Sequence, residues 1–282
     1  MKKRLISLLL AFSMVISLLP VGAFADDDTV DIPITDNYPT ASNKGTQAVP
    51  VEENGGDWFF TPSADPSKPE DGVLTLCGDS KSYDFGYNTL DCKVVIYSRA
   101  AKCSTLEGGY YNNSVECRGG VEIRGGFYRA SVTLTPYTDE YTNFIANGTF
   151  WDDVAASSTQ ITGGAFYGNV MLYKDTTIQN GSAKGAVPRF FSSSSAGSQT
   201  IVKNFSGVIA GGRFWGPVDG EVTCGIFQEK PAQIAAGSHT WTLTTKSGTY
   251  GFNAELMPLT SGSPLYVVGT ETRGQWNDLA YD

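Results

Sequence analysis

The chain has 282 residues, of which 41% are hydrophobic, 12% are aromatic and 17% are charged, and its formal net charge at pH 7 is −9. This composition supplies enough apolar surface for a packed core and excludes an intrinsically disordered protein. The acidic balance argues against a nucleic-acid partner, because a phosphate backbone binds to clustered positive charge.

The N-terminal segment predicts export. It begins with the basic residues Lys2, Lys3 and Arg4, continues with an apolar run over residues 5–19, and ends in an Ala-x-Ala cleavage site at 23–25. This is the order of regions in a secretory signal peptide, so we expect residues 1–25 to be removed and the product to be secreted or held at the cell surface. Cleavage removes three basic residues and no acidic one, which changes the net charge from −9 to −12. No later stretch reaches about 18 apolar residues, so we expect no membrane insertion after cleavage.

The mature chain divides into three predicted regions. Residues 26–71 are rich in Asp, Pro, Ser, Thr and Asn and form a leader or cap, in which Trp58-Phe59-Phe60 covers the open end of the region that follows. Residues 72–230 contain short alternating runs typical of strands and show no sustained helical period. Residues 231–282 form C-terminal strands or a second cap.

Between residues 106 and 218 the chain repeats one ten-residue frame six times. The frame is an aliphatic residue, any residue, Gly or Asn, Gly, any residue, usually an aromatic, three free positions and Val. The second glycines of successive copies lie 17, 22, 16, 17 and 31 residues apart, and a period of this length is typical of stacked coils. The copies span residues 106–115, 123–132, 145–154, 161–170, 178–187 and 209–218.

Each position of the frame has a structural interpretation. Alternate residues of a strand share a face, so the aromatic and the Val point into the core. The glycines mark a corner where the backbone takes a positive φ or passes close to the coil beneath. A single coil buries too little surface to offset its ordering entropy, so stability comes from stacking coils about 4.8 Å apart. The longer spacing before Ile209 predicts that Phe190-Phe191 and the following serines leave the stack and return.

The Ile-x-Gly-Gly-x-Phe-x-x-x-Val frame, following the signal peptide, resembles the right-handed parallel β-helix repeats of secreted and surface proteins of Gram-positive Firmicutes, within the pectate-lyase-like superfamily. The resemblance covers residues 72–230. It implies an all-β, single-stranded right-handed parallel β-helix, a β-solenoid, with N- and C-terminal caps. The superfamily includes polysaccharide lyases and hydrolases as well as adhesins without catalysis, so the fold does not choose an activity.

The catalytic groups of β-helix hydrolases are incomplete here. Those enzymes carry paired aspartates, Gly-His-Gly and Arg-x-Lys, whereas the only histidine of this chain is His239, outside the repeats, and Arg-x-Lys is absent. Asp152 and Asp153 are the only adjacent aspartates inside a frame copy. Paired carboxylates support glycoside hydrolysis, but a solvated turn is the simpler interpretation of this pair.

The sequence also predicts no metal site and no cofactor. Asp139, Glu140 and Asp175 lie on predicted loops near Arg129, but no spacing forces them to converge on a calcium ion. None of the five cysteines forms a Cys-x-x-Cys pair, which argues against zinc. Export permits one or two disulfides, while stacked coils also accommodate reduced cysteine as a small apolar side chain, and both alternatives stay open. The cysteines are Cys77, Cys92, Cys103, Cys117 and Cys224.

Outward-facing aromatics are the candidate binding residues. Positions flanking the buried aromatic carry Tyr110, Phe127, Trp151, Tyr167 and Trp215, and in-register coils place Trp151 beside Tyr167. Aromatic faces suit sugar rings or a protein partner. The alternative interpretation is that such a ladder only stabilises neighbouring strands.

We therefore expect a secreted or cell-surface β-solenoid that acts as a non-catalytic binding or adhesion module for a glycan or an extracellular protein. A polysaccharide lyase or glycoside hydrolase of the β-helix type, using Asp152 and Asp153, is the first alternative. A purely structural surface spacer is the second.

Overall fold

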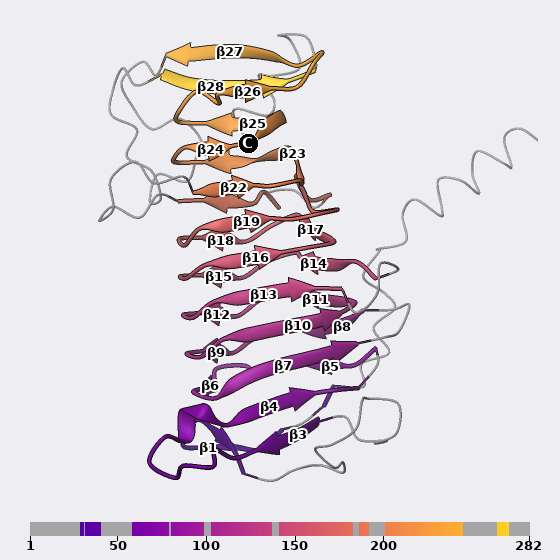
Figure 1. The fold of residues 1–282 in the computed structure, drawn as a ribbon, viewed down its shortest axis with the longest axis vertical. Coiled ribbons are helices and arrows are strands. Elements are labelled where there is room, and N and C mark those ends of the chain that lie inside the picture. The colour runs from indigo at the N-terminus through magenta and orange to yellow at the C-terminus, as the bar shows by residue number, and fades with distance from the viewer. Residues whose placement is uncertain are drawn as a thin grey trace, which may run out of the picture.

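A computed structural model of the chain describes residues 29–30, 32–40, 58–78, 80–98, 103–136, 141–182, 186–191, 201–244 and 264–270. They form an all-β parallel solenoid of about six turns, whose long axis is vertical in Figure 1. The predicted signal peptide and the pair Asp139 and Glu140 lie outside the described residues. Within the described part, the one helical segment is a 3-10 turn, η1 (Pro69–Asp71), and no helix has the length and apolar character needed to span a membrane.

From β8 to β22 the strands come in threes, one strand for each face of a coil. Each strand pairs in parallel with the strand of the same face in the next coil, as Val115 does with Val132. The first face consists of β8 (Ser104–Leu106), β11 (Val121–Ile123), β14 (Asn143–Ile145), β17 (Thr159–Ile161) and β20 (Thr177–Ile178). The second face consists of β9 (Tyr110–Tyr111), β12 (Phe127–Tyr128), β15 (Thr149–Phe150), β18 (Ala165–Phe166) and β21 (Arg189–Phe190). The third face consists of β10 (Val115–Gly119), β13 (Val132–Thr135), β16 (Val154–Ala156), β19 (Val170–Leu172) and β22 (Val202–Asn204).

Further strands continue the stack in both directions. On the N-terminal side these are β4 (Val73–Leu76), β5 (Ser82–Tyr83), β6 (Thr89–Leu90) and β7 (Lys93–Ser98). On the C-terminal side, β23 (Val208–Phe214) and β25 (Glu221–Phe227) each pass through the first and second faces, β24 (Val218–Asp219) extends the third face, and β26 (Gln233–Ile234) pairs with β25.

Antiparallel strands lie at both ends of the column (Figure 1). At the N-terminal end, β3 (Trp58–Thr61) runs antiparallel to β4 and buries Trp58, and β1 (Ile34–Thr35) forms a hairpin with β2 (Tyr38–Pro39). At the C-terminal end, β28 (Pro264–Gly269) runs antiparallel to β25, and β27 (His239–Thr244) runs antiparallel to β28.

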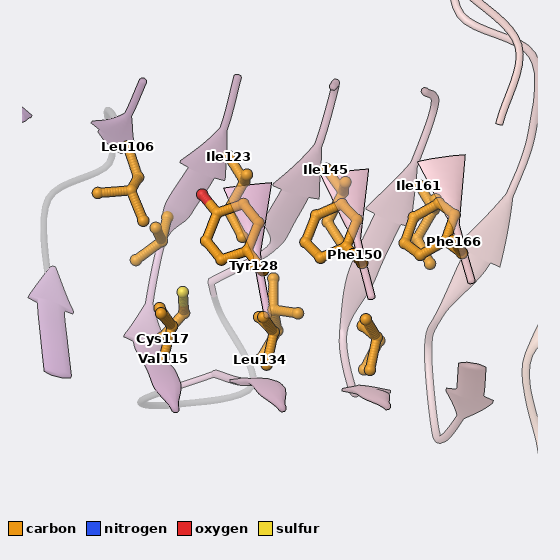
Figure 2. Close-up of a cluster of buried hydrophobic side chains, with 14 of the residues drawn as sticks. Leu106, Val115, Cys117, Ile123, Tyr128, Leu134, Ile145, Phe150, Ile161 and Phe166 are labelled. Atoms are coloured by element: carbon orange, nitrogen blue, oxygen red, sulfur yellow. The ribbon is translucent and has the colours of Figure 1, made fainter. Parts of the chain in front are cut away.

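A column of stacked aromatic rings runs through the core, as the frame predicts. Neighbouring ring centroids lie 4.7–4.8 Å apart with interplanar angles of 11° or less. Figure 2 shows three of these rings one coil apart, with the isoleucines of the first face beside them. Each ring is at most 1% exposed, so the column is the centre of the core. Its members are Tyr111, Tyr128, Phe150, Phe166, Phe190, Phe214 and Phe227.

The two glycines of the frame serve different purposes. Gly164 has a φ of +99°, which disfavours any side chain, and it lies over the ring of Phe166 in its own coil. Gly163 has an ordinary φ, but a Cβ there would collide with the carbonyl oxygen of Ala146 in the coil beneath. Both predicted reasons for the Gly-Gly pair are therefore present, one for each glycine.

The second half of the fifth frame copy, residues 178–187, is predicted wrongly. Ile178 lies in the first face as expected, but the ring paired with Phe166 is Phe190, and the valine paired with Val170 is Val202. Ten residues separate β20 from β21 in this coil, whereas three separate β17 from β18 in the coil before it. The extra residues lengthen only the connection, and the ring of Phe190 still pairs with the ring of Phe166. Phe190 therefore belongs to the core and not to an excursion.

No disulfide joins any of the five cysteines in the structure, which decides between the two alternatives left open by the sequence. Cys77, Cys92 and Cys117 are buried, and Cys103 and Cys224 are partly buried. Because burial penalises the thiolate, it raises the pKa of the Cys92 thiol to about 11 and that of Cys117 to about 12. These two thiols act as small apolar side chains.

Candidate functional site

The outer surface of the second face, from β9 to the second half of β25, is the candidate site, and we call it the aromatic face. Side chains alternate along a strand, so the residues before and after each buried ring point outward and form two rows along the axis. The first row, before the rings, holds Tyr110, Phe127, Thr149, Ala165, Arg189, Arg213 and Ile226. The second row, after the rings, holds Asn112, Arg129, Trp151, Tyr167, Phe191, Trp215 and Gln228.

The five predicted binding residues belong to two separate stacks on this face. In the first row, the rings of Tyr110 and Phe127 lie 4.9 Å apart with an interplanar angle of 6°. In the second row, the rings of Trp151 and Tyr167 lie 4.3 Å apart at 12°, as predicted for neighbouring coils. Trp215 lies in the same row, two coils above Tyr167.

Phe191 completes the second stack. Its ring centroid lies 4.7 Å from that of Tyr167 and 4.8 Å from that of Trp215, so four rings continue without interruption from Trp151 to Trp215. Aromatic pairs of this kind contribute about 0.5–1.5 kcal/mol each beyond the area they bury. The second stack therefore helps to hold successive coils together, as the structural interpretation of the ladder expected.

Exposure changes along the second stack. Trp151 is 54% exposed, whereas Phe191 is only 7% exposed. At the C-terminal end, Trp215 packs against Ile226 and the β28 residues Leu265 and Val267. The C-terminal end of the stack is thus largely covered, by packing against Ile226 and β28, and its N-terminal end is exposed.

The two stacks meet at an offset between the coils of β12 and β15. Phe127 ends the first stack because Thr149 follows it in the first row, and Trp151 begins the second because Arg129 precedes it in the second row. Each of these two rings has one face that no other ring of the described chain covers. Rings stacked at 4.3–4.9 Å leave no space for a ligand between them, so a flat ligand stacks only on the end ring of a stack. Of the four end rings, Tyr110 and Trp215 are partly buried, whereas Phe127 and Trp151 are exposed. We call Phe127, Arg129, Thr149 and Trp151 the offset site.

The aromatic face carries positive charge and no carboxylate in either row, although the whole chain has a net charge of −9. On the third face Arg118 forms an ion pair with Glu116 at 2.6 Å, and next to the first face Arg124 pairs with Glu122 at 2.9 Å. By contrast, no carboxylate of the described chain lies within ion-pair distance of Arg129 or Arg189.

The aspartates considered for catalysis lie at the corner that follows the second row. The Asp153 carboxylate accepts hydrogen bonds from the backbone N–H and the side-chain amide of Asn169, both at 2.9 Å, and thereby joins two successive corners. Asp152 is exposed and accepts a hydrogen bond from the Asp153 N–H. This geometry explains the pair as corner residues.

The other titratable candidates stay apart. His239 lies exposed in β27, and Asp175 forms an exposed ion pair with Lys174 at 3.3 Å. Among the residues that the structure describes, no three His, Cys, Asp or Glu side chains gather as metal ligands.

Sequence reasoning missed Phe191 as a member of the second stack. Its signal is a run of paired aromatics, in which each buried ring is followed directly by an outward one. These pairs are Phe-Trp at 150–151, Phe-Tyr at 166–167, Phe-Phe at 190–191 and Phe-Trp at 214–215. The pair at 190–191 falls outside the frame spacing, which hid it.

Comparisons with models of known protein families, with curated proteins and with solved structures found no match to this chain. The structure shows a parallel β-solenoid, and its membership of the pectate-lyase-like superfamily and its Gram-positive origin stay predictions.

Proposed function

We propose that this protein is a secreted or cell-surface binding module without catalytic activity, and that its offset site binds a glycan. The observation that carries the proposal is that the residues Phe127 and Trp151 are 42% and 54% exposed and that each has one ring face with no other ring stacked on it. Aromatic rings offer a large contact area at a low cost in conformational entropy, and they sit here on a rigid parallel sheet. The predicted signal peptide supports an extracellular site of action.

The covered end of the second stack limits where recognition takes place. Phe191 and Trp215 stabilise the coils beneath β28, so they do not contribute open faces. This division assigns the structural role of the ladder to its C-terminal end and ligand binding to its N-terminal end. An extracellular protein is the alternative partner for the same surface.

The test compares two pairs of exposed aromatics. Phe127→Ala with Trp151→Ala removes both open faces of the offset site. The matched control, Tyr173→Ala with Phe205→Ala, removes another exposed stacked pair, whose rings lie 5.1 Å apart at a different corner and are 40% and 63% exposed. We expect a glycan array to retain the wild type and the control, and to bind the offset-site variant at least roughly tenfold more weakly, which corresponds to about 1.4 kcal/mol.

Thermal unfolding of both double variants checks that each remains folded. Equal retention of the wild type and the offset-site variant would contradict the proposal. An array on which the wild type binds no glycan would also contradict it, and would favour the protein partner or the structural spacer.

A further inference from the structure

We infer that the glycan is a polyanion, whose sulfate or carboxylate groups bind Arg129 and Arg189 while its sugar rings contact the offset site. This inference rests on the proposed function and names the class of ligand for the same surface.

The first argument is the separation of charge over the surface. An acidic protein repels polyanions in general, so a polyanion binds only where the local charge is positive. The outward rows of the aromatic face contain arginines and no Asp or Glu. The guanidinium groups of Arg118 and Arg124, on other parts of the coils, are already bound to glutamates, whereas those of Arg129 and Arg189 have no carboxylate partner in the described chain. These two arginines can therefore bind an external anion without breaking an internal ion pair.

The second argument is the spacing of the arginines. Arg129 follows β12 and Arg189 lies in β21, three coils further along the column. At about 4.8 Å per coil they are about 14 Å apart along the axis, so one small anion cannot contact both. A polymer with several negative groups spans this distance when it runs along the column.

The third argument is what lies between the two arginines. In the first row, only the short side chains of Thr149 and Ala165 separate Phe127 from Arg189, and the rings of Trp151 and Tyr167 lie beside them in the second row. A chain that follows the first row thus passes the open face of Phe127 before it reaches Arg189.

An exposed carboxylate borders the path at the corner after the second row. Asp152 is exposed at the corner after Trp151, and the Asp153 carboxylate is held by Asn169. Repulsion from Asp152 keeps an anionic chain on the first-row side of the stack. We therefore expect Asp152→Asn to strengthen polyanion binding, an effect opposite to the loss that a catalytic Asp152 would show.

The experiment measures binding of the full-length mature chain to three polysaccharides at 0.15 M NaCl. Dextran sulfate carries sulfate without carboxylate, alginate carries carboxylate without sulfate, and dextran is neutral. The test variant is Arg129→Gln with Arg189→Gln. The control, Arg124→Gln with Lys203→Gln, removes the same amount of positive charge from other parts of the coils. Charged hydrogen bonds contribute about 1.5–3 kcal/mol, so we expect the test variant to bind at least roughly tenfold more weakly and the control to bind like the wild type.

The results separate the two proposals. Tighter binding of dextran sulfate than of alginate identifies sulfate as the recognised group, the reverse order identifies carboxylate, and in both cases added NaCl weakens binding. If the test and control variants lose polysaccharide binding equally, or if dextran binds as tightly as the two charged polysaccharides, the inference of a polyanionic ligand is overturned. If dextran binding then depends on Phe127 and Trp151, the proposed glycan function survives. A further outcome is that none of the three polysaccharides binds and that polyglutamate binds in a manner that depends on the two arginines. This outcome overturns both the glycan function and the polyanionic glycan, and it identifies an acidic protein as the partner.

Discussion

Cys117 illustrates how a single small side chain fits the solenoid interior. It lies in the third face between Ile96 and Leu134 of the neighbouring coils, and it is fully buried. Because no water reaches the sulfur, the uncharged thiol is strongly preferred, and its pKa rises from 9.0 to about 12.

This shift predicts a loss of stability at alkaline pH. Above pH 9 the unfolded chain releases the thiol proton, whereas the folded chain keeps it up to about pH 12. The contribution of Cys117 to stability is therefore complete below pH 9 and is lost as the pH rises toward 12. Between pH 8 and pH 10 we expect the free energy of unfolding of the wild type to fall by about 1 kcal/mol more than that of Cys117→Val, as measured by urea denaturation. Identical pH dependence of the two proteins would show that Cys117 is not buried as described.

Other residues were predictable from the frame alone. The Gly-Gly corner and the inward positions of Phe150, Phe166 and Phe214 follow from strand alternation and from the conformational freedom of glycine. The state of the cysteines was not predictable, because it depends on which side chains meet across faces, and the spacing of cysteines along the chain does not contain that information.

At the scale of the element, the coil of β20, β21 and β22 shows whether side-chain stacking or spacing along the chain determines the register of the strands. Its two connections contain ten and eleven residues, whereas the corresponding connections of the preceding coil contain three each. The strands nevertheless pair ring with ring and valine with valine. Stacking of like side chains therefore determines the register, and spacing along the chain does not.

This register makes Phe190 a sensitive position. Its ring is 1% exposed and lies between those of Phe166 and Phe214, with centroid distances of 4.8 Å to each. We expect Phe190→Ala to lower the free energy of unfolding by about 3–5 kcal/mol, the usual effect of removing a buried ring. Trp151→Ala, at an exposed end of the second stack, serves as the comparison and should have a much smaller effect in the same urea titration. A small effect of Phe190→Ala would place this residue in a surface excursion after all.

The aromatic face could be predicted only in part for the same reason. Trp151 and Tyr167 follow an unbroken run of frame copies, so their stacking could be deduced from the sequence. Arg189 and Phe191 sit between two long connections, and only the pairing of β21 with β18 and β23 places them on this face. Arg129 follows Tyr128 inside a frame copy, so its outward position could be deduced from the sequence, whereas the position of Arg189 depended on this pairing.

At the scale of the whole molecule, each coil contacts mainly the coils directly above and below it. Stability in such a column is close to a sum of contributions from neighbouring coils, so the ends open more easily than the middle. The end strands β3 and β27 pair with β4 and β28, whereas β11, β14 and β17 are each paired on both sides.

Hydrogen exchange tests this distribution of stability. We expect backbone amides of β11, β14 and β17 to exchange slowest, and those of β3 and β27 to exchange faster. Uniform protection from one end to the other would indicate that the column opens as a single cooperative unit.

The long connections around β21 have a consequence for protein engineering. They add residues at two corners of one coil while the strands on either side keep their alignment. Lengthening a flexible connection costs little free energy, since each doubling of its length adds only about 0.6 kcal/mol. The same corners therefore offer positions at which foreign peptide epitopes can be grafted and displayed beside Arg189, with the scaffold beneath them unchanged.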